Sequence, residues 1–148
     1  MITTNNTMTT TKTKKVLYWT NTGFSALALA AIGAADLARV PEVMAGLTHL
    51  GYPTYFATII GVWKLLAVTA ILAPGLPRLK EWAYAGLFFV LSGAATSHAI
   101  LGDPAGVVVF PLMILGTVLT SWVLQPARVA AVAAKWPNST PMPSKARA

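Results

Sequence analysis

Residues 55–73 read YFATIIGVWKLLAVTAILA, and the only charged residue in this stretch is Lys64, near its middle. About 20 helical residues at 1.5 Å each match a hydrocarbon core of ~30 Å, so the stretch is long enough to cross a bilayer. A lysine at the centre of such a span costs at least ~2.5–3.5 kcal/mol on insertion scales. We therefore expect Lys64 to face other helices of a bundle. Two roles are open for it: a charge whose pairing fixes helix packing, or a group that binds or moves something.

The composition of the whole chain is that of a membrane protein. Of its 148 residues, 55% are hydrophobic and 10% are charged, and the net charge is +7. A soluble domain carries about 25% charged residues. The basic residues lie in the tails and one loop, which indicates contact with an anionic membrane surface and not with nucleic acid. Since it has no cysteine, the chain alone forms no disulfide, iron–sulfur cluster or thiolate metal site.

Apolar segments on both sides of residues 55–73 complete a set of four predicted spans. These cover about residues 16–38, 55–73, 82–101 and 107–124. Pro41, in the connection after the first span, suits the first position of a helix, and the apolar residues behind it share one face. We therefore predict an all-α membrane protein, a four-transmembrane-helix bundle with a short interfacial helix between the first two spans.

The two ends of the chain differ in composition from this transmembrane domain, residues 16–124. Residues 1–15 are rich in Thr and Asn and end in a basic cluster, and residues 125–148 are polar and basic and contain prolines. The N-terminal stretch has nothing to bury in a packed core. We therefore expect a disordered basic N-terminal tail and a basic C-terminal tail.

The basic residues are distributed unequally over the two predicted sides of the membrane. Nine fall on one side and Arg39 alone on the other. The nine are Lys12, Lys14, Lys15, Arg78, Lys80, Arg128, Lys135, Lys145 and Arg147. By the positive-inside rule, the sequence predicts a multi-pass protein of the inner (plasma) membrane with both termini in the cytoplasm.

This orientation brings the remaining polar residues of the spans toward the outer surface. Asp36 and His98 end the two spans that run outward, and Lys64 lies about ten residues, or ~14 Å, below that surface at 1.5 Å per residue. We expect a cavity open to the outer leaflet, with Lys64 at its base and Asp36 and His98 near its rim. Asp36 is the expected counter-ion of Lys64, with the difference in depth filled by a water or a ligand.

The candidate site follows from this arrangement. Lys64 would supply a positive charge or hydrogen-bond donor, Asp36 and His98 would exchange protons, and Trp63 and Tyr84 would form apolar walls. The candidate catalytic residues are Lys64, Asp36 and His98, and the candidate ligand-binding residues are Trp63, Tyr84, Ser25, Glu42 and His49. No metal site is predicted. A solvated carboxylate at a helix end and a packing histidine remain the plainer explanations for Asp36 and His98.

Five short segments, in this order and spacing, resemble the DoxX-like membrane proteins. They are Gly33–Leu37 (GAADL), His49–Pro53 (HLGYP), Gly61–Leu66 (GVWKLL), Lys80–Gly86 (KEWAYAG) and Gly93–His98 (GAATSH). The resemblance implies a small four-helix integral membrane protein in which Asp36, Lys64 and His98 match the family pattern. Founding members of the family are subunits linked to thiosulfate and quinone oxidation. Distant relatives include a vertebrate chaperone for nicotinic receptors, and most bacterial members have no assigned reaction.

Two functions of different classes stay open. In the first, the bundle binds a small amphipathic or anionic molecule, a quinone or a lipid-like metabolite, with redox-linked or acid–base chemistry as a further step. In the alternative, the protein is a non-catalytic membrane partner, assembly factor or chaperone, and it associates with itself or with another membrane protein. The lack of cysteine excludes the dithiol chemistry of other small four-helix quinone reductases. A bis-histidine haem is disfavoured because His49, one of its two available ligands, lies in a connection.

Overall fold

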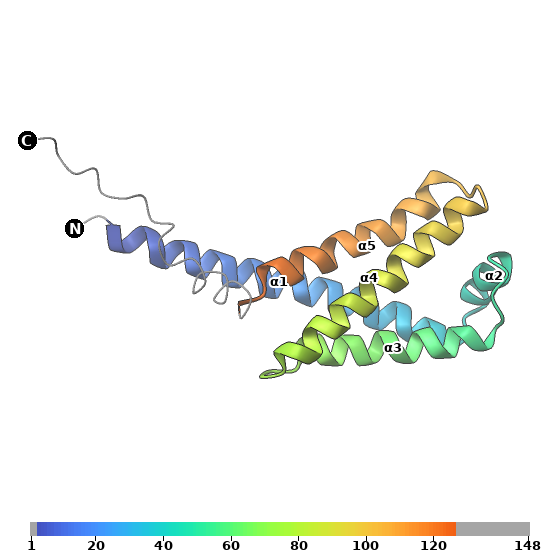
Figure 1. Ribbon diagram of the computed structural model, residues 1–148, viewed down its shortest axis with the longest axis horizontal. Helices are drawn as coiled ribbons and strands as arrows, with labels where there is room; N and C mark the ends of the chain where they lie inside the picture. The colour runs from blue at the N-terminus through green and yellow to red at the C-terminus, as the bar shows by residue number, and fades with distance from the viewer. Residues whose placement is uncertain (1–2, 127–148) are drawn as a thin grey trace, which may run out of the picture.

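The computed structural model describes residues 3–126, with side chains from Thr13 onward, and this part of the chain is helical without strands. The helices are α1 (Thr3–Leu37), α2 (Pro41–His49), α3 (Tyr55–Leu72), α4 (Pro77–Ile100) and α5 (Ala105–Leu124) (Figure 1). Helices α3, α4 and α5 are each long and apolar enough to cross a membrane. A fourth crossing is formed if α1 and α2, which are bent by 84° relative to each other, are taken as one broken span. The predicted fold class, an all-α membrane bundle, is confirmed.

The helix at the N-terminus differs from the sequence prediction. Helix α1 begins at Thr3, so the expectation of a disordered tail is wrong from this residue on. A helix is costly to start but cheap to extend, and residues 3–15 contain neither glycine nor proline to stop the extension. Most of the predicted C-terminal tail, residues 127–148, lies outside the described residues.

The other helix boundaries lie close to those predicted. Helix α4 begins at Pro77, five residues before the expected start, because a proline in the first helical turn has no N–H to leave unpaired. Gly75 and Gly102 form the turns on either side of α4 with φ values of +75° and +73°, a conformation that other residues rarely adopt.

The helices form two packed pairs that cross. Helix α1 packs against α3 and α4 against α5, and further contacts join α1 to α5 and α3 to α4. Figure 1 shows that α3 and α4 meet at their connecting turn and then diverge toward the end of the molecule where α2 lies. The core fills the region where the pairs cross; it contains Leu29, Ile71, Tyr84, Leu87, Leu91, Ile114, Leu115 and Val118.

A chain of buried polar side chains joins the two pairs. The hydroxyl of Ser121 lies 2.5 Å from that of Thr22 and 2.8 Å from that of Tyr84, and the Asn21 amide donates to the carbonyl of Thr117 at 2.7 Å. These bonds connect α1, α4 and α5. Polar groups inside a membrane need such internal partners because lipid offers none. The polar residues of the first span are thus used for helix packing.

Candidate functional site

Helices α1 and α3 approach each other closely at two glycines, Gly33 of α1 and Gly61 of α3. A Cβ atom added to Gly61 would lie 2.9 Å from the Gly33 carbonyl oxygen and 3.0 Å from the Asp36 Cβ. Only glycine therefore allows the backbones to come this close. The residue three positions after Gly33 is Asp36, and the residue three positions after Gly61 is Lys64. Because α1 and α3 run in opposite directions, Asp36 lies beside Gly61 and Lys64 beside Gly33. The long lysine side chain then reaches along the crossing to the carboxylate.

Lys64 and Asp36 form a buried ion pair. The Lys64 Nζ donates to the Asp36 Oδ2 at 2.7 Å, and the two side chains are 9% and 4% exposed. The predictions that Lys64 faces the bundle interior and that Asp36 is its counter-ion are both confirmed. The expectation of a water or ligand between them is wrong. Helix α1 ends beside the middle of α3, so Asp36 lies at the depth of Gly61 and not at an outer rim.

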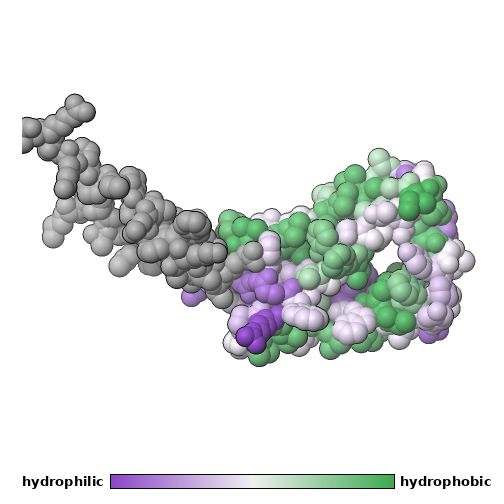
Figure 2. Space-filling view, viewed as in Figure 1, coloured by the Kyte–Doolittle hydropathy of each residue, from purple (hydrophilic) through white to green (hydrophobic). Residues whose placement is uncertain are grey.

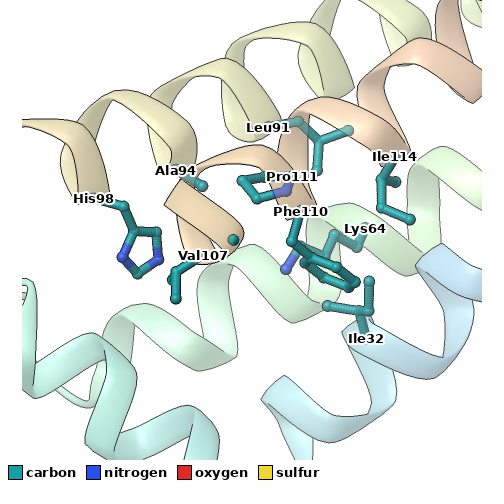
Figure 3. Close-up of a pocket in the computed structure, with 10 residues that line it drawn as sticks. Ile32, Lys64, Leu91, Ala94, His98, Val107, Phe110, Pro111 and Ile114 are labelled. Atoms are coloured by element: carbon teal, nitrogen blue, oxygen red, sulfur yellow. The ribbon is translucent and has the colours of Figure 1, made fainter. Parts of the chain in front are cut away.

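A cavity of about 510 Å³ lies beside this pair, between all four long helices. Its walls are Ile32 of α1, Lys64 of α3, Leu91, Ala94 and His98 of α4, and Gly106, Val107, Phe110, Pro111 and Ile114 of α5. Figure 3 shows the Lys64 amine reaching toward Phe110, with His98 at the far end of the group. Lys64 and His98 both line this cavity, and its predicted opening toward the outer leaflet stays a prediction. Asp36 does not line the cavity.

The His98 end of the cavity lies beside a second polar cluster. The two oxygens of the Asp103 carboxylate contact the His98 Nδ1 at 2.7 Å and the His49 Nε2 at 2.8 Å. Nearby, the Tyr52 hydroxyl lies 3.0 Å from that of Ser97. These contacts connect α2 and the loop after it to the end of α4. These contacts therefore join the two helix pairs at the end of the molecule where the pairs diverge. They lie beside the opening visible in Figure 2.

Asp103 gives this cluster a defined pH dependence. Hydrogen bonds from His98 and His49 hold the pKa of the Asp103 carboxyl below its ordinary value of 3.8. Because the folded state binds this proton less tightly than the unfolded chain, the carboxylate stabilises the fold above pH 3.8. The contribution is lost as the pH falls through the lowered pKa of the folded state.

We expect the melting temperature to fall on acidification below pH 3.8 by more in the wild type than in Asp103→Asn. Thermal unfolding in detergent, followed by circular dichroism across this pH range, measures the difference. Glu42→Gln removes an exposed carboxylate with no partner among the described side chains and should follow the wild type. Equal acid sensitivity of the wild type and Asp103→Asn would contradict the bridging role.

The other candidate residues are not gathered at the cavity. Tyr84 is buried but bonds to Ser121, and the Ser25 hydroxyl donates to the Asn21 carbonyl of its own helix. Trp63 is 64% exposed on the outer side of α3. Glu42 is exposed on α2, and His49 contributes to the Asp103 cluster instead of the cavity wall. Their predicted roles in ligand binding stay predictions.

Sequence reasoning missed two features of the site. The first is the contribution of α5, where Phe110 and Pro111 form cavity walls. It was missed because an apolar residue in a membrane span can face either lipid or the protein interior, and the sequence does not show which. The second is Asp103, in the connection between the spans predicted at 82–101 and 107–124, for which no role was predicted. Asp103 follows His98 by five residues, across the end of a helix, and this spacing was the available signal that the two side chains could meet. The described residues include no group of three or more His, Asp or Glu side chains that could hold a metal ion.

Comparison with known proteins identifies a family but no individual relative. A sequence model described as the DoxX-like family matches residues 20–122, which include the Lys64–Asp36 pair and all of the cavity walls. No curated protein and no solved structure matches the chain. Since the match covers well over half of the sequence, the chain belongs to the DoxX-like family.

Proposed function

We propose that the cavity binds a small amphipathic molecule, a quinone or a lipid-like metabolite, with its polar head at Lys64. The observation that carries this proposal is the position of Lys64: its amine borders an otherwise largely apolar cavity of about 510 Å³ inside the membrane span. Ligand sites are commonly apolar pockets of ~300–1,000 Å³ with a few placed polar groups. Ionisable residues inside a membrane segment commonly mark such sites.

The bonding of Lys64 favours one type of head group. Its ammonium has three N–H donors. Among the described residues, one of these donors is used, in the hydrogen bond to the Asp36 carboxylate. Asp36 also cancels the charge of the lysine. A carbonyl oxygen, which accepts a hydrogen bond without adding a full charge, therefore fits better than an anion. In this proposal Lys64 exchanges protons with the head group, Asp36 exchanges them with Lys64, and His98 does so at the opposite end.

Filling the mouth of the cavity tests this proposal. Gly106 lines the cavity, and a Cβ atom added to it would meet no atom within 4 Å; Gly116, on the same helix, is equally open but lies outside the cavity. We expect Gly106→Leu to reduce the amount of co-purifying amphipathic molecule at least tenfold and Gly116→Leu to leave it unchanged. Mass spectrometry of organic extracts measures both. An equal amount from both variants would contradict binding in this cavity.

The proposed entry from the outer leaflet depends on the topology. Nine basic residues on one side against Arg39 on the other support a cytoplasmic location for both termini. We expect reporter fusions at Gly75 and at the C-terminus to be active as cytoplasmic fusions, and a fusion at Gly46 to be active as an external one. An external C-terminus would reverse the proposed orientation and the side from which the ligand enters.

A second candidate function is that of a non-catalytic partner or assembly factor. The direct contact between Lys64 and Asp36, 2.7 Å long and buried, is the observation that favours it, because a purely structural pair would have this geometry too. In that case the pair would fix the α1–α3 crossing, and the exposed apolar faces would contact another membrane protein. The Gly106→Leu comparison separates the two functions, since filling the cavity would then have no effect on co-purifying molecules.

A further inference from the structure

A second hollow lies between α3 and α4 and meets the proposed ligand cavity at Lys64, which lines both. Its volume is about 460 Å³, and its walls include Trp63, Ala67 and Ala70 of α3 and Leu79, Trp82 and Gly86 of α4. The α4 side extends from Leu79 to Val90, eleven residues or ~16 Å of helix. That length equals about half of a ~30 Å hydrocarbon core, the thickness of one leaflet. We refer to this hollow as the α3–α4 groove.

One end of the α3–α4 groove is basic. Arg78 and Lys80 flank Leu79, the groove residue closest to the α3–α4 turn. Neither side chain has a hydrogen bond or ion pair with the side chains the structure describes. The neighbouring Glu81, whose carboxylate accepts a hydrogen bond from the Trp122 indole at 2.7 Å, offsets one of these two charges and leaves residues 78–81 with a net positive charge. Figure 2 shows strongly hydrophilic surface at this turn, next to paler and apolar surface.

An exposed indole lies at the same end. Trp82 is 81% exposed and forms part of the groove, and tryptophan prefers the level of the lipid head groups. The order along α4 is therefore two basic side chains, an interfacial indole and then an apolar channel one leaflet long. A phospholipid presents the complementary order of anionic head group, glycerol region and acyl chain.

We propose that the α3–α4 groove binds one anionic phospholipid, with its head group at Arg78 and Lys80 and an acyl chain between Trp63 and Trp82. With the topology proposed above, this lipid comes from the cytoplasmic leaflet, where the positive-inside residues meet anionic lipids. The groove shares Lys64 with the ligand cavity and no other wall residue, and the proposed head-group site lies at the opposite end of the groove, beside the α3–α4 turn. Bilayer lipid surrounds this surface in any case, so the distinguishing property is selectivity for the negative head group.

The charge requirement is tested on the full chain by native mass spectrometry after incubation with equal amounts of phosphatidylglycerol and phosphatidylcholine in detergent. We expect the wild type to retain one phosphatidylglycerol at least tenfold more than phosphatidylcholine. The Arg78→Gln/Lys80→Gln variant should lose this preference. Both positions are at the protein surface, so the variant should fold as the wild type does. Equal retention of both lipids by the wild type, or an unchanged preference in the variant, would overturn the proposal.

The requirement for the groove is tested with a matched pair of glycines on α4. Gly86 lines the groove and Gly93 does not, and a Cβ at either position meets no atom within 4 Å. We expect Gly86→Leu to lower phosphatidylglycerol retention at least tenfold and Gly93→Leu to leave it unchanged. Glycerol 3-phosphate, which has the charge without the chain, should not displace the lipid at equal concentration. Equal retention by both variants, or displacement by glycerol 3-phosphate, would show that the groove plays no part.

Discussion

Replacing Lys64 with methionine is expected to lower the free energy of unfolding by about 3–5 kcal/mol, because removing one partner of a buried ion pair leaves the other charge unpaired. The Asp36 side chain is 4% exposed and accepts its hydrogen bond from Lys64 at 2.7 Å. Asp36→Asn should destabilise in the same way by leaving the ammonium without its carboxylate. Reversible unfolding in mixed detergent micelles measures both. Lys80→Met, which removes a lysine with no ion-pair partner in the described structure, should change stability by less than about 0.5 kcal/mol.

The double variant Lys64→Met/Asp36→Asn distinguishes pairing from two separate effects. It removes both charges together, so we expect it to cost less than the sum of the single changes. Lys64→Arg should not restore wild-type stability, because the guanidinium is larger and planar and the Gly33–Gly61 crossing leaves little space beside the pair. Strict additivity of the single effects would contradict the shared site.

The second large effect is expected at the glycine crossing. Gly61→Leu should lower stability by about 3 kcal/mol, since overpacking a tight contact costs about 1–3 kcal/mol or more. Its Cβ would lie 2.9 Å from the Gly33 carbonyl oxygen, a backbone atom that moves only if the helices separate. The gain in helix propensity on replacing glycine, about 1 kcal/mol at most, is too small to offset this. The separation would also lengthen the Lys64–Asp36 contact.

The control for this change is Gly93→Leu, the same substitution on α4 at a position with open space around it. It should leave stability unchanged or raise it slightly, because leucine favours the helix over glycine. The same unfolding measurement applies to both variants. If Gly61→Leu is as stable as Gly93→Leu, the close crossing does not position the ion pair.

The sequence predicted the partner of Lys64 but not its depth. The cost of a charge inside a span requires a counter-ion, and Asp36 is the acidic residue of the first span, so the pairing could be inferred. The depth depends on where α1 ends relative to α3. That register comes from the contact between Gly33 and Gly61, which involves two distant segments and leaves no pattern within either of them.

The same limit explains the misplaced cavity wall. Tyr84 was predicted as an apolar wall of the ligand site, and the residue is buried. Its hydroxyl, however, meets Ser121 instead of the cavity, because α5 packs against that face. The Asp103 cluster combines side chains from three segments, and the bonds that form it depend on where α2 lies. The four spans follow from local composition, whereas the neighbours of each face follow from packing between helices.

Ligand binding at Lys64 is best tested by measuring how much quinone is retained by the variant Lys64→Met/Asp36→Asn, in which both charges of the pair are removed. Wild type and variant are incubated with a short-chain quinone, washed in detergent and extracted for mass spectrometry, and the amount of quinone is compared per amount of protein. The wild type should retain the quinone and the variant at least tenfold less, because the donor at the cavity wall has been removed while the apolar walls remain. Equal quinone retention by both proteins, or none by the wild type, would contradict a binding site at Lys64.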